Sequence, residues 1–233
     1  MAGQNATAGD VETALYSVGN ETELANIRKR LAPDEPAIGM RMRDLFDTAK
    51  AFSDLPLAEV NVLLDHPAYE PRMAAMCILD FQARGHLDDT VRREMFQLYL
   101  DRHDRITTWD MVDRSAPRVV GAFLAGRSPA PLRKLAKAAQ PLRRRTAITA
   151  PLYFVRAGTD DDVENGFSIA GLLATDPMPE VHNAVGIFLK HASGRDLDSV
   201  HRFLDAHAGS MPRPALRLAT EKLSAADRAR YRS

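Results

Sequence analysis

The chain has few of the features that mark secreted, membrane or metal-binding proteins. Among its 233 residues there is a single cysteine, Cys77, so no internal disulfide can form and a reducing cytoplasm is the expected compartment. The longest uncharged apolar run covers eight residues, 119–126, far short of the ~20 that a membrane-spanning helix needs. There is no glycine-rich phosphate loop, and the seven histidines lack metal-ligand spacing. We therefore expect no membrane span, no metal and no cofactor.

The N-terminal region also lacks an apolar stretch. Its composition of Ala, Gly, Thr and Asn fits neither a signal peptide nor a transit peptide. We expect residues 1–20 to form a disordered tail and residues 21–233 to form one domain, which is long enough to bury a core.

Signals for β-strands are scarce, since apolar residues recur every three or four positions rather than every two. This periodicity predicts an all-α protein with apolar faces that suit a core. The two clearest faces are Ala147, Ile148, Pro151, Leu152 and Val155, and then Val181, Ala184, Val185, Phe188 and Leu189.

The expected helices are regularly spaced along the chain. The second helices of successive pairs are predicted to begin near Glu70, Thr107, Pro141, Met178 and Pro212, at intervals of 37, 34, 37 and 34 residues. Helix pairs repeating at this interval stack into HEAT-like solenoids, so we expect a helical repeat domain whose second helices line a concave surface. The alternative is an irregular helical bundle with coincidental spacing.

The net charge of zero hides an uneven distribution. Residues 1–100 carry ten Lys and Arg against sixteen Asp and Glu, whereas residues 101–160 carry twelve against five. Between Arg114 and Thr159 there are ten basic residues and no acidic one. A basic patch inside an otherwise acidic to neutral chain is typical of nucleic-acid binding, and Arg114 and Arg118 are two of its members.

The only tryptophan lies at the start of this basic region. Thr107 and Asp110 have the spacing of a helix capping box, which accounts for Asp110. Asp113 follows Trp109 by four residues, so the carboxylate and the indole share one face of the helix. The alternative is a buried tryptophan with Asp113 paired to Arg114 or Arg118.

Three consecutive arginines open a later helix. Arg143, Arg144 and Arg145 follow Pro141 and occupy the first turn, where the helix dipole disfavours cations by ~0.3–1 kcal/mol each. A phosphate backbone would compensate them, because guanidinium forks and helix N-termini both suit phosphate. The basic patch is extended by two residues of the preceding helix, Arg133 and Lys137. The alternative is a solvated basic face.

Several segments resemble one known family, the AlkD-like DNA alkylation repair proteins, over residues 21–231. The Trp-Asp-x-Val-Asp element and the closing Met-Pro-Arg element are the most specific. The matching segments are Gly39-Met-Arg-Met-Arg-Asp-Leu, Leu63-Leu-Asp-His-Pro-Ala-Tyr-Glu-Pro-Arg72, Thr108-Trp-Asp-Met-Val-Asp113 with Ser115-Ala-Pro117, Arg144-Arg-Thr-Ala-Ile148, Val181-His-Asn-Ala-Val-Gly186 and Met211-Pro-Arg213.

The resemblance implies a HEAT-like solenoid that binds double-stranded, alkylated DNA as a monomer. The glycosylases of the family remove cationic N3- and N7-alkylated purines, with Asp, Trp and Arg at the positions of Asp113, Trp109 and Arg145. Relatives that excise alkylpurines have a second tryptophan where this chain has Ile187, so half of the aromatic clamp is absent. Helical geometry places Ile187 off the apolar core face and towards the concave surface.

Two other functions remain open from the sequence. The substitution at Ile187 and the retained basic patch favour a catalytically silent DNA-binding protein as the first alternative. The acidic first hundred residues and the net charge of zero favour a helical protein-interaction scaffold as the second.

Overall fold

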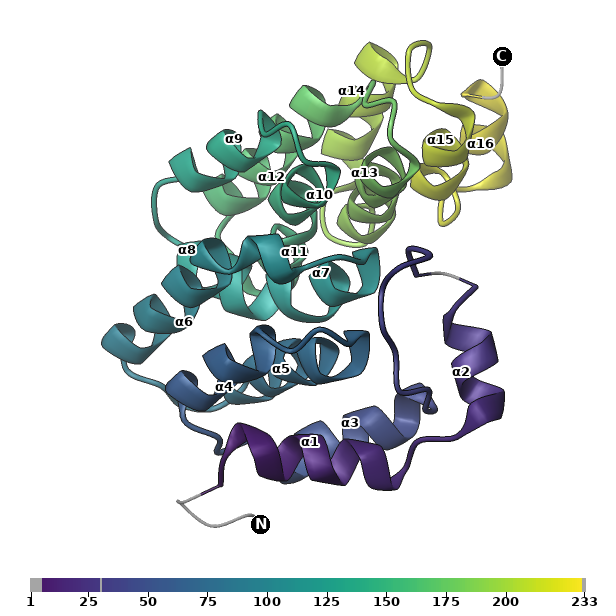
Figure 1. The fold of residues 1–233 in the computed structure, drawn as a ribbon. Helices are drawn as coiled ribbons and strands as arrows, with labels where there is room; N and C mark the ends of the chain where they lie inside the picture. Colours follow the sequence, from purple (N-terminus) through teal and green to yellow (C-terminus); the bar gives the residue numbers. More distant parts are fainter. Residues whose placement is uncertain (1–5, 30, 232–233) are drawn as a thin grey trace. The chain divides into compact units, whose positions relative to one another are not determined.

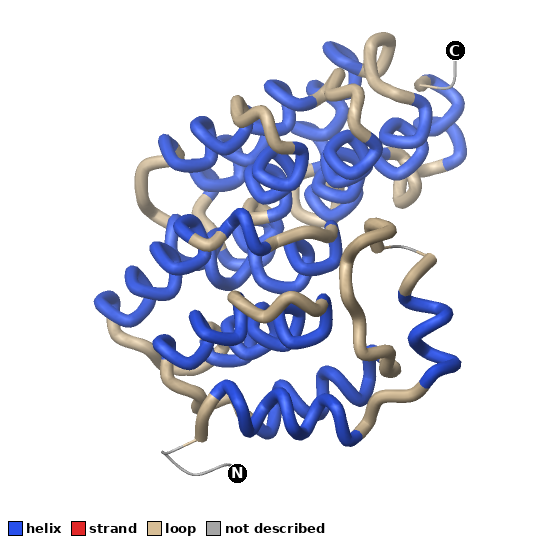
Figure 2. The backbone as a smooth tube through the Cα atoms, viewed as in Figure 1, coloured by secondary structure: helices blue, strands red, loops and turns tan. Residues whose placement is uncertain are grey.

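A computed structural model describes residues 6–29 and 31–231, and every regular element in these ranges is helical (Figures 1 and 2). The prediction of an all-α protein is therefore confirmed. The chain divides between Ser115 and Ala116 into two compact units, where the sequence predicted one domain. None of the helices described is both long enough and apolar enough to cross a membrane.

The described residues of the first unit form seven α-helices and one short 3₁₀ turn, η1. They are α1 (Ala8–Ser17), α2 (Glu21–Ile27), α3 (Met42–Ala51), α4 (Leu57–Leu64), α5 (Tyr69–Gln82), α6 (Asp89–Asp101), η1 (His103–Arg105) and α7 (Trp109–Ala116), whose last residue belongs to the second unit.

The second unit begins with a π-helical turn, η2, in which the N–H of Ala122 donates to the carbonyl of Pro117. Its elements are η2 (Pro117–Gly121), α8 (Ala122–Leu124), α9 (Ala130–Ala136), α10 (Pro141–Thr149), α11 (Leu152–Ala157), α12 (Asp160–Leu173), α13 (Pro179–Ala192), α14 (Leu197–His207), α15 (Arg213–Ala219) and α16 (Ala225–Arg230).

Helix α5 is the centre of the first unit and packs against α1, α3 and α4. All of its residues from Tyr69 to Asp80 are buried, including three charged ones. Burial also raises the pKa of the Cys77 thiol to about 12, which keeps this residue neutral at physiological pH. Because α5 is buried on all sides, its charged side chains need hydrogen-bond or ion-pair partners inside the protein. These partners belong to the candidate functional site.

The expectation of a disordered tail over residues 1–20 is wrong for α1. The side chain of Thr7 caps this helix in a capping box with Asp10, whose pKa is lowered by the hydrogen bonds from Thr7. Val11 and Leu15 are fully buried one turn apart, and the helix packs against α3, α4 and α5. A low-complexity composition concealed an apolar face only two side chains wide. Residues 1–5 of the predicted tail lie outside the described residues.

In the second unit, α10, α13 and α15 lie side by side with α13 in the middle (Figure 1). The predicted second helices begin within two residues of their expected positions. Their observed first residues are Tyr69, Trp109, Pro141, Pro179 and Arg213. Proline at the first helical position costs no hydrogen bond, which is why the starts of α10 and α13 can be read from the sequence.

One of the two predicted apolar faces is confirmed and the other spans a break. On α13 the face from Val181 to Leu189 is buried to within 3% exposure. The face from Ala147 to Val155 belongs to two helices, because α10 ends at Thr149 and α11 begins at Leu152. Pro151 has no N–H to donate to a carbonyl of α10, so the hydrogen-bond pattern of this helix is interrupted there.

The contact between α13 and α15 depends on Gly186. A Cβ at this position would lie 2.5 Å from the carbonyl oxygen of Ala215 and 2.8 Å from Cβ of Leu218. We expect Gly186→Ala to lower the free energy of unfolding by about 1–3 kcal/mol, as other overpacked cores do, in urea denaturation.

Gly171→Ala is the matched control, because Gly171 also lies within a helix and its Cβ would meet only Nε2 of His207, at 3.7 Å. It should stabilise the protein by about 0.5–1 kcal/mol, since alanine favours the helix. Equal effects of the two substitutions would contradict the close approach of α13 and α15.

Candidate functional site

The indole of Trp109 stands at the first position of α7 and is 47% exposed, which is unusual for a large apolar side chain. Asp113 follows one helical turn later and is half-buried. The intervening Met111 and Val112 are fully buried, and Met111 projects from the side of the helix opposite Trp109. An exposed aromatic face and a carboxylate thus occupy one side of α7, as the sequence predicted.

The predicted capping box between Thr107 and Asp110 is not formed, because α7 begins at Trp109 and the hydroxyl of Thr107 donates to Glu35 instead. The carboxylate of Asp110 accepts hydrogen bonds from the Tyr69 hydroxyl at 2.8 Å and from the Thr108 hydroxyl at 2.5 Å. Asp110 therefore has a structural role, because it accepts from the N–H of Met111 in the first turn of α7 and ties this turn to the fully buried Tyr69 on α5.

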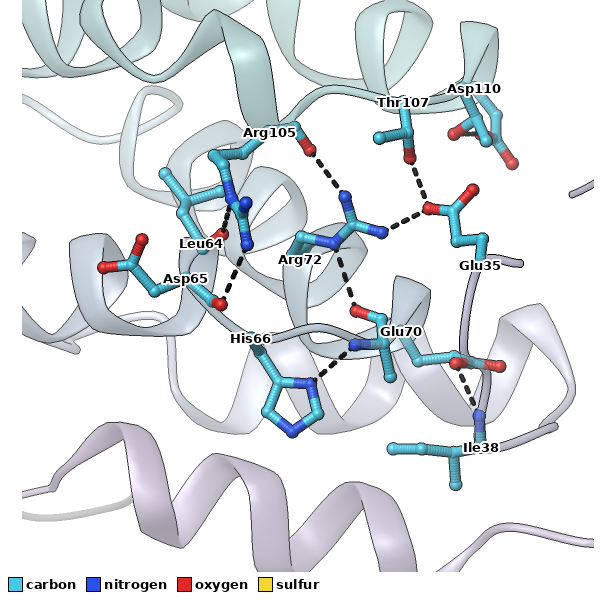
Figure 3. Close-up of polar contacts among 12 residues, drawn as sticks. Glu35, Ile38, Leu64, Asp65, His66, Glu70, Arg72, Arg105, Thr107 and Asp110 are labelled. Carbon is cyan, nitrogen blue, oxygen red and sulfur yellow. Dashed lines mark hydrogen bonds and ion pairs between the residues drawn. The ribbon is translucent and has the colours of Figure 1, made fainter. Parts of the chain in front are cut away.

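A second set of polar contacts holds the segment that precedes α7 (Figure 3). Arg72 on α5 pairs with Glu35, which accepts from Thr107, and also donates to the backbone carbonyl oxygens of Ala68 and Arg105, both at 3.2 Å. The Arg72 and Glu35 side chains are 5% and 9% exposed. Ion pairs this buried persist only when further hydrogen bonds satisfy them, and Arg72 has such bonds.

The neighbouring Glu70 holds the same extended segment from the other side. Its two carboxylate oxygens accept from the backbone N–H groups of Ile38 and Gly39, each at 2.8 Å (Figure 3). Sequence reasoning missed Glu70, Arg72 and Glu35 as parts of the site. Three charged residues, Glu70, Arg72 and Asp80, inside an otherwise largely apolar helix were the available signal.

Arg114, predicted to bind DNA, has its contacts within the first unit. Its guanidinium lies over the rings of Phe46 and Phe81, at 4.5 and 4.8 Å from their centroids, and pairs with the fully buried Asp80 at 3.1 Å. Five residues separate Arg114 from Trp109, which turns the two side chains ~140° apart around a helix of ~3.6 residues per turn. The partner of Arg114 is thus Asp80, and not Asp113 as one alternative had it.

The three arginines of α10 have different surroundings. Arg144 forms a bidentate pair with Asp176 at 2.6 and 3.2 Å and donates to the carbonyl oxygens of Ala138 and Ala139, so its charge is balanced within the protein and its role in DNA binding stays a prediction. Arg145 is 4% exposed and donates to the carbonyl oxygen of Glu180 at the start of α13. Arg143 is half-buried, and its side chain contacts no carboxylate among residues 6–29 and 31–231.

The remaining predicted residues lie on the surface or near it. Arg133 and Lys137, at the end of α9, are exposed, and Arg118 is half-buried in η2. Ile187 on α13 is half-buried beside the fully buried Phe188, so its position outside the core face is confirmed. In the part of the chain that the structure describes, no three His, Cys, Asp or Glu side chains gather as metal ligands.

Comparison with known structures identifies the fold. The chain is similar to a protein described as a predicted DNA alkylation repair enzyme from Enterococcus faecalis, with a TM-score of 0.68 and 15% identity over 89% of this chain and 97% of that one. It is also similar to AlkD2 from Streptococcus mutans, with a TM-score of 0.55 and 15% identity over 88% and 99% of the two chains. These similarities define an AlkD-like helical repeat fold.

A family model also matches the sequence. Residues 11–223 match the model of the DNA alkylation repair enzymes, and the chain belongs to this family. No protein with a curated description matches the chain. The family resemblance drawn from the sequence is therefore confirmed.

The Tyr69–Asp110 hydrogen bond should fix the start of α7. We expect Tyr69→Phe to cost about 1–3 kcal/mol of unfolding free energy, because the half-buried carboxylate of Asp110 loses a donor, and to change the emission of Trp109 in the folded protein. Since Trp109 is the only tryptophan, its fluorescence reports on α7 alone.

The matched control is Tyr16→Phe, which removes the hydroxyl of a tyrosine that is 53% exposed on α1. It should change stability by less than about 0.5 kcal/mol and leave the emission unchanged. Indistinguishable results for the two variants would show that the bond to Asp110 does not position α7.

Proposed function

We propose that the protein is a DNA glycosylase that excises cationic N3- and N7-alkylated purines from double-stranded DNA. Membership of the DNA alkylation repair family supports a role in DNA repair. The observation that carries the finer proposal is the exposed indole of Trp109 with the carboxylate of Asp113 one turn further along the same helix face.

The chemistry requires little more than a carboxylate. An alkylated purine already carries a positive charge, so it leaves with the electron pair of the glycosidic bond as a neutral base and needs no general acid. The sugar left behind is oxocarbenium-like, as in other glycoside cleavages. A carboxylate ~4 Å from that cation, at an effective dielectric constant of ~20, contributes roughly 4 kcal/mol, or about three decades of rate.

Each candidate residue has a defined task in this proposal. Asp113 stabilises the sugar cation and orients the water that attacks it, and Trp109 attracts the cationic sugar or base through its π face. Arg145 can hold a phosphate oxygen while it donates to Glu180, because a guanidinium has five N–H donors. Ile187 provides van der Waals contact but no π face, so the protein should be slower than a relative with tryptophan there.

The first prediction of this proposal concerns Asp113. Purified protein should release N7-methylguanine and N3-methyladenine from methylated DNA, and Asp113→Asn should lower the rate about a thousandfold because the fixed negative charge is lost. Ile187→Trp should raise the rate. If the wild type releases these bases no faster than Asp113→Asn does, the proposed glycosylase activity is refuted.

A catalytically silent DNA-binding protein is the second candidate function. It is favoured by Ile187 in place of an aromatic residue together with Arg143, whose guanidinium contacts no carboxylate among the described residues. Such a protein would bind DNA in a salt-dependent manner without releasing bases.

DNA binding can be measured without catalysis. Titration of DNA should quench Trp109 fluorescence, and Arg143→Ala should weaken binding and reduce the salt dependence of log Kd by about one unit of slope. Arg43→Ala is the control, because the Arg43 side chain is 89% exposed on α3 and pairs with Asp47. The absence of any DNA binding at ~50 mM salt would exclude both candidate functions and favour the interaction scaffold.

A further inference from the structure

A cavity of about 290 Å³ lies at the C-terminal end of the second unit, outside the residues used in the proposed function. It is formed by α15, the connection to α16, and α16 with the residue that ends it. Its lining consists of Arg213, Leu216, Arg217, Thr220, Glu221, Arg228 and Tyr231.

The cavity is electropositive. Three arginines line it against one carboxylate, that of Glu221. This carboxylate accepts a hydrogen bond from Nζ of Lys190 on α13 at 2.7 Å, which lowers the pKa of Glu221 and balances its charge from outside the lining. The charge of Arg217, which precedes Glu221 by four residues, also lowers the pKa of this carboxyl group, after the larger effect of Lys190.

The positions of the arginines make this charge unfavourable in the empty protein. Arg213 and Arg217 lie four residues apart on α15, and like charges at this spacing destabilise a helix. Arg228 approaches the same cavity from α16. A bound anion would accept charge-assisted hydrogen bonds from these guanidinium groups.

Two of the residues that line the cavity, Leu216 and Tyr231, are largely apolar and nearly buried. Leu216 and Tyr231 are each 6% exposed, and the Tyr231 hydroxyl donates to Asp205 at 3.0 Å, which holds the ring in place. Asp205 is itself paired with Arg230 at 2.7 Å, so its charge is also balanced. Guanidinium groups beside largely apolar side chains suit a ligand with a phosphate group and a less polar body.

We propose that this cavity binds a phosphate monoester. The lining carries a formal charge of three positive groups and one negative group, which matches the charge of roughly −1.5 to −2 of a monoester at neutral pH better than the single charge of a backbone phosphodiester. Two ligands share this chemistry, a phosphorylated DNA end and a free mononucleotide. The site is independent of base excision, so it stands or falls separately from the proposed glycosylase.

The test compares three probes with the full-length protein. A short 5′-phosphorylated oligonucleotide, the same oligonucleotide with a 5′-hydroxyl, and adenosine monophosphate are titrated by fluorescence anisotropy or ³¹P NMR. The 5′-phosphate should tighten oligonucleotide binding at least tenfold if a DNA end is the ligand. If a free nucleotide is the ligand, adenosine monophosphate should bind and the two oligonucleotides should not differ.

Arg217→Ala and Arg228→Ala should each abolish the phosphate-dependent binding, whereas Arg43→Ala on α3, which removes a side chain that is 89% exposed, should leave it intact. Arg217 is exposed and Arg228 half-buried, so both variants should fold, which circular dichroism verifies. Arg217→Lys should restore part of the binding, because it keeps the charge without the fork. Two results would overturn the proposal. In the first, the 5′-phosphate does not change oligonucleotide binding and adenosine monophosphate does not bind. In the second, phosphate-dependent binding persists in both alanine variants.

Discussion

A guanidinium buried at the start of α5 is the interaction on which the candidate site of the first unit depends. Arg72 meets Glu35 from the extended segment before α3 and the carbonyl oxygens of Ala68 and Arg105, so one side chain joins three separate segments. Removing a charge of this kind from water costs several kcal/mol, which only multiple hydrogen bonds repay. The network is therefore formed as a whole or not at all, and the path of the chain into α7 follows from it.

The second unit uses the same device between α10 and α13. Arg144 pairs with Asp176, and Asp176 in turn accepts from the N–H of Met178 at 3.0 Å just before α13. Arg145 reaches the carbonyl oxygen of Glu180 in the first turn of that helix. Buried arginines thus align the starts of neighbouring helices in both units, and the arginine fork suits this task because it can contact carboxylates and backbone carbonyls at once.

The elements of the fold could be predicted more fully than the partners of its charges. Helix starts such as Pro141 and Pro179 are local signals, readable from the chemistry of one residue and its neighbours. Ion pairs are not local, since Glu35 and Arg72 are 37 residues apart and Arg144 and Asp176 are 32 apart. A sequence shows that an arginine needs compensation, but tertiary packing decides whether a phosphate, a carboxylate or a carbonyl oxygen supplies it.

The internal partners of the arginines in α10 weaken the electrostatic argument for DNA binding at this helix. Cations in the first turn of α10 require compensation because the helix dipole is positive there. The structure supplies that compensation internally for Arg144 through Asp176 and in part for Arg145 through Glu180. The electrostatic argument for a phosphate ligand at this helix therefore rests mainly on Arg143.

The case for a catalytic role accordingly rests on α7, where the indole of Trp109 remains 47% exposed although the helix buries its opposite side completely. Exposing an indole sacrifices burial energy of about 1.5–3 kcal/mol, and a ligand that stacks on Trp109 would recover it.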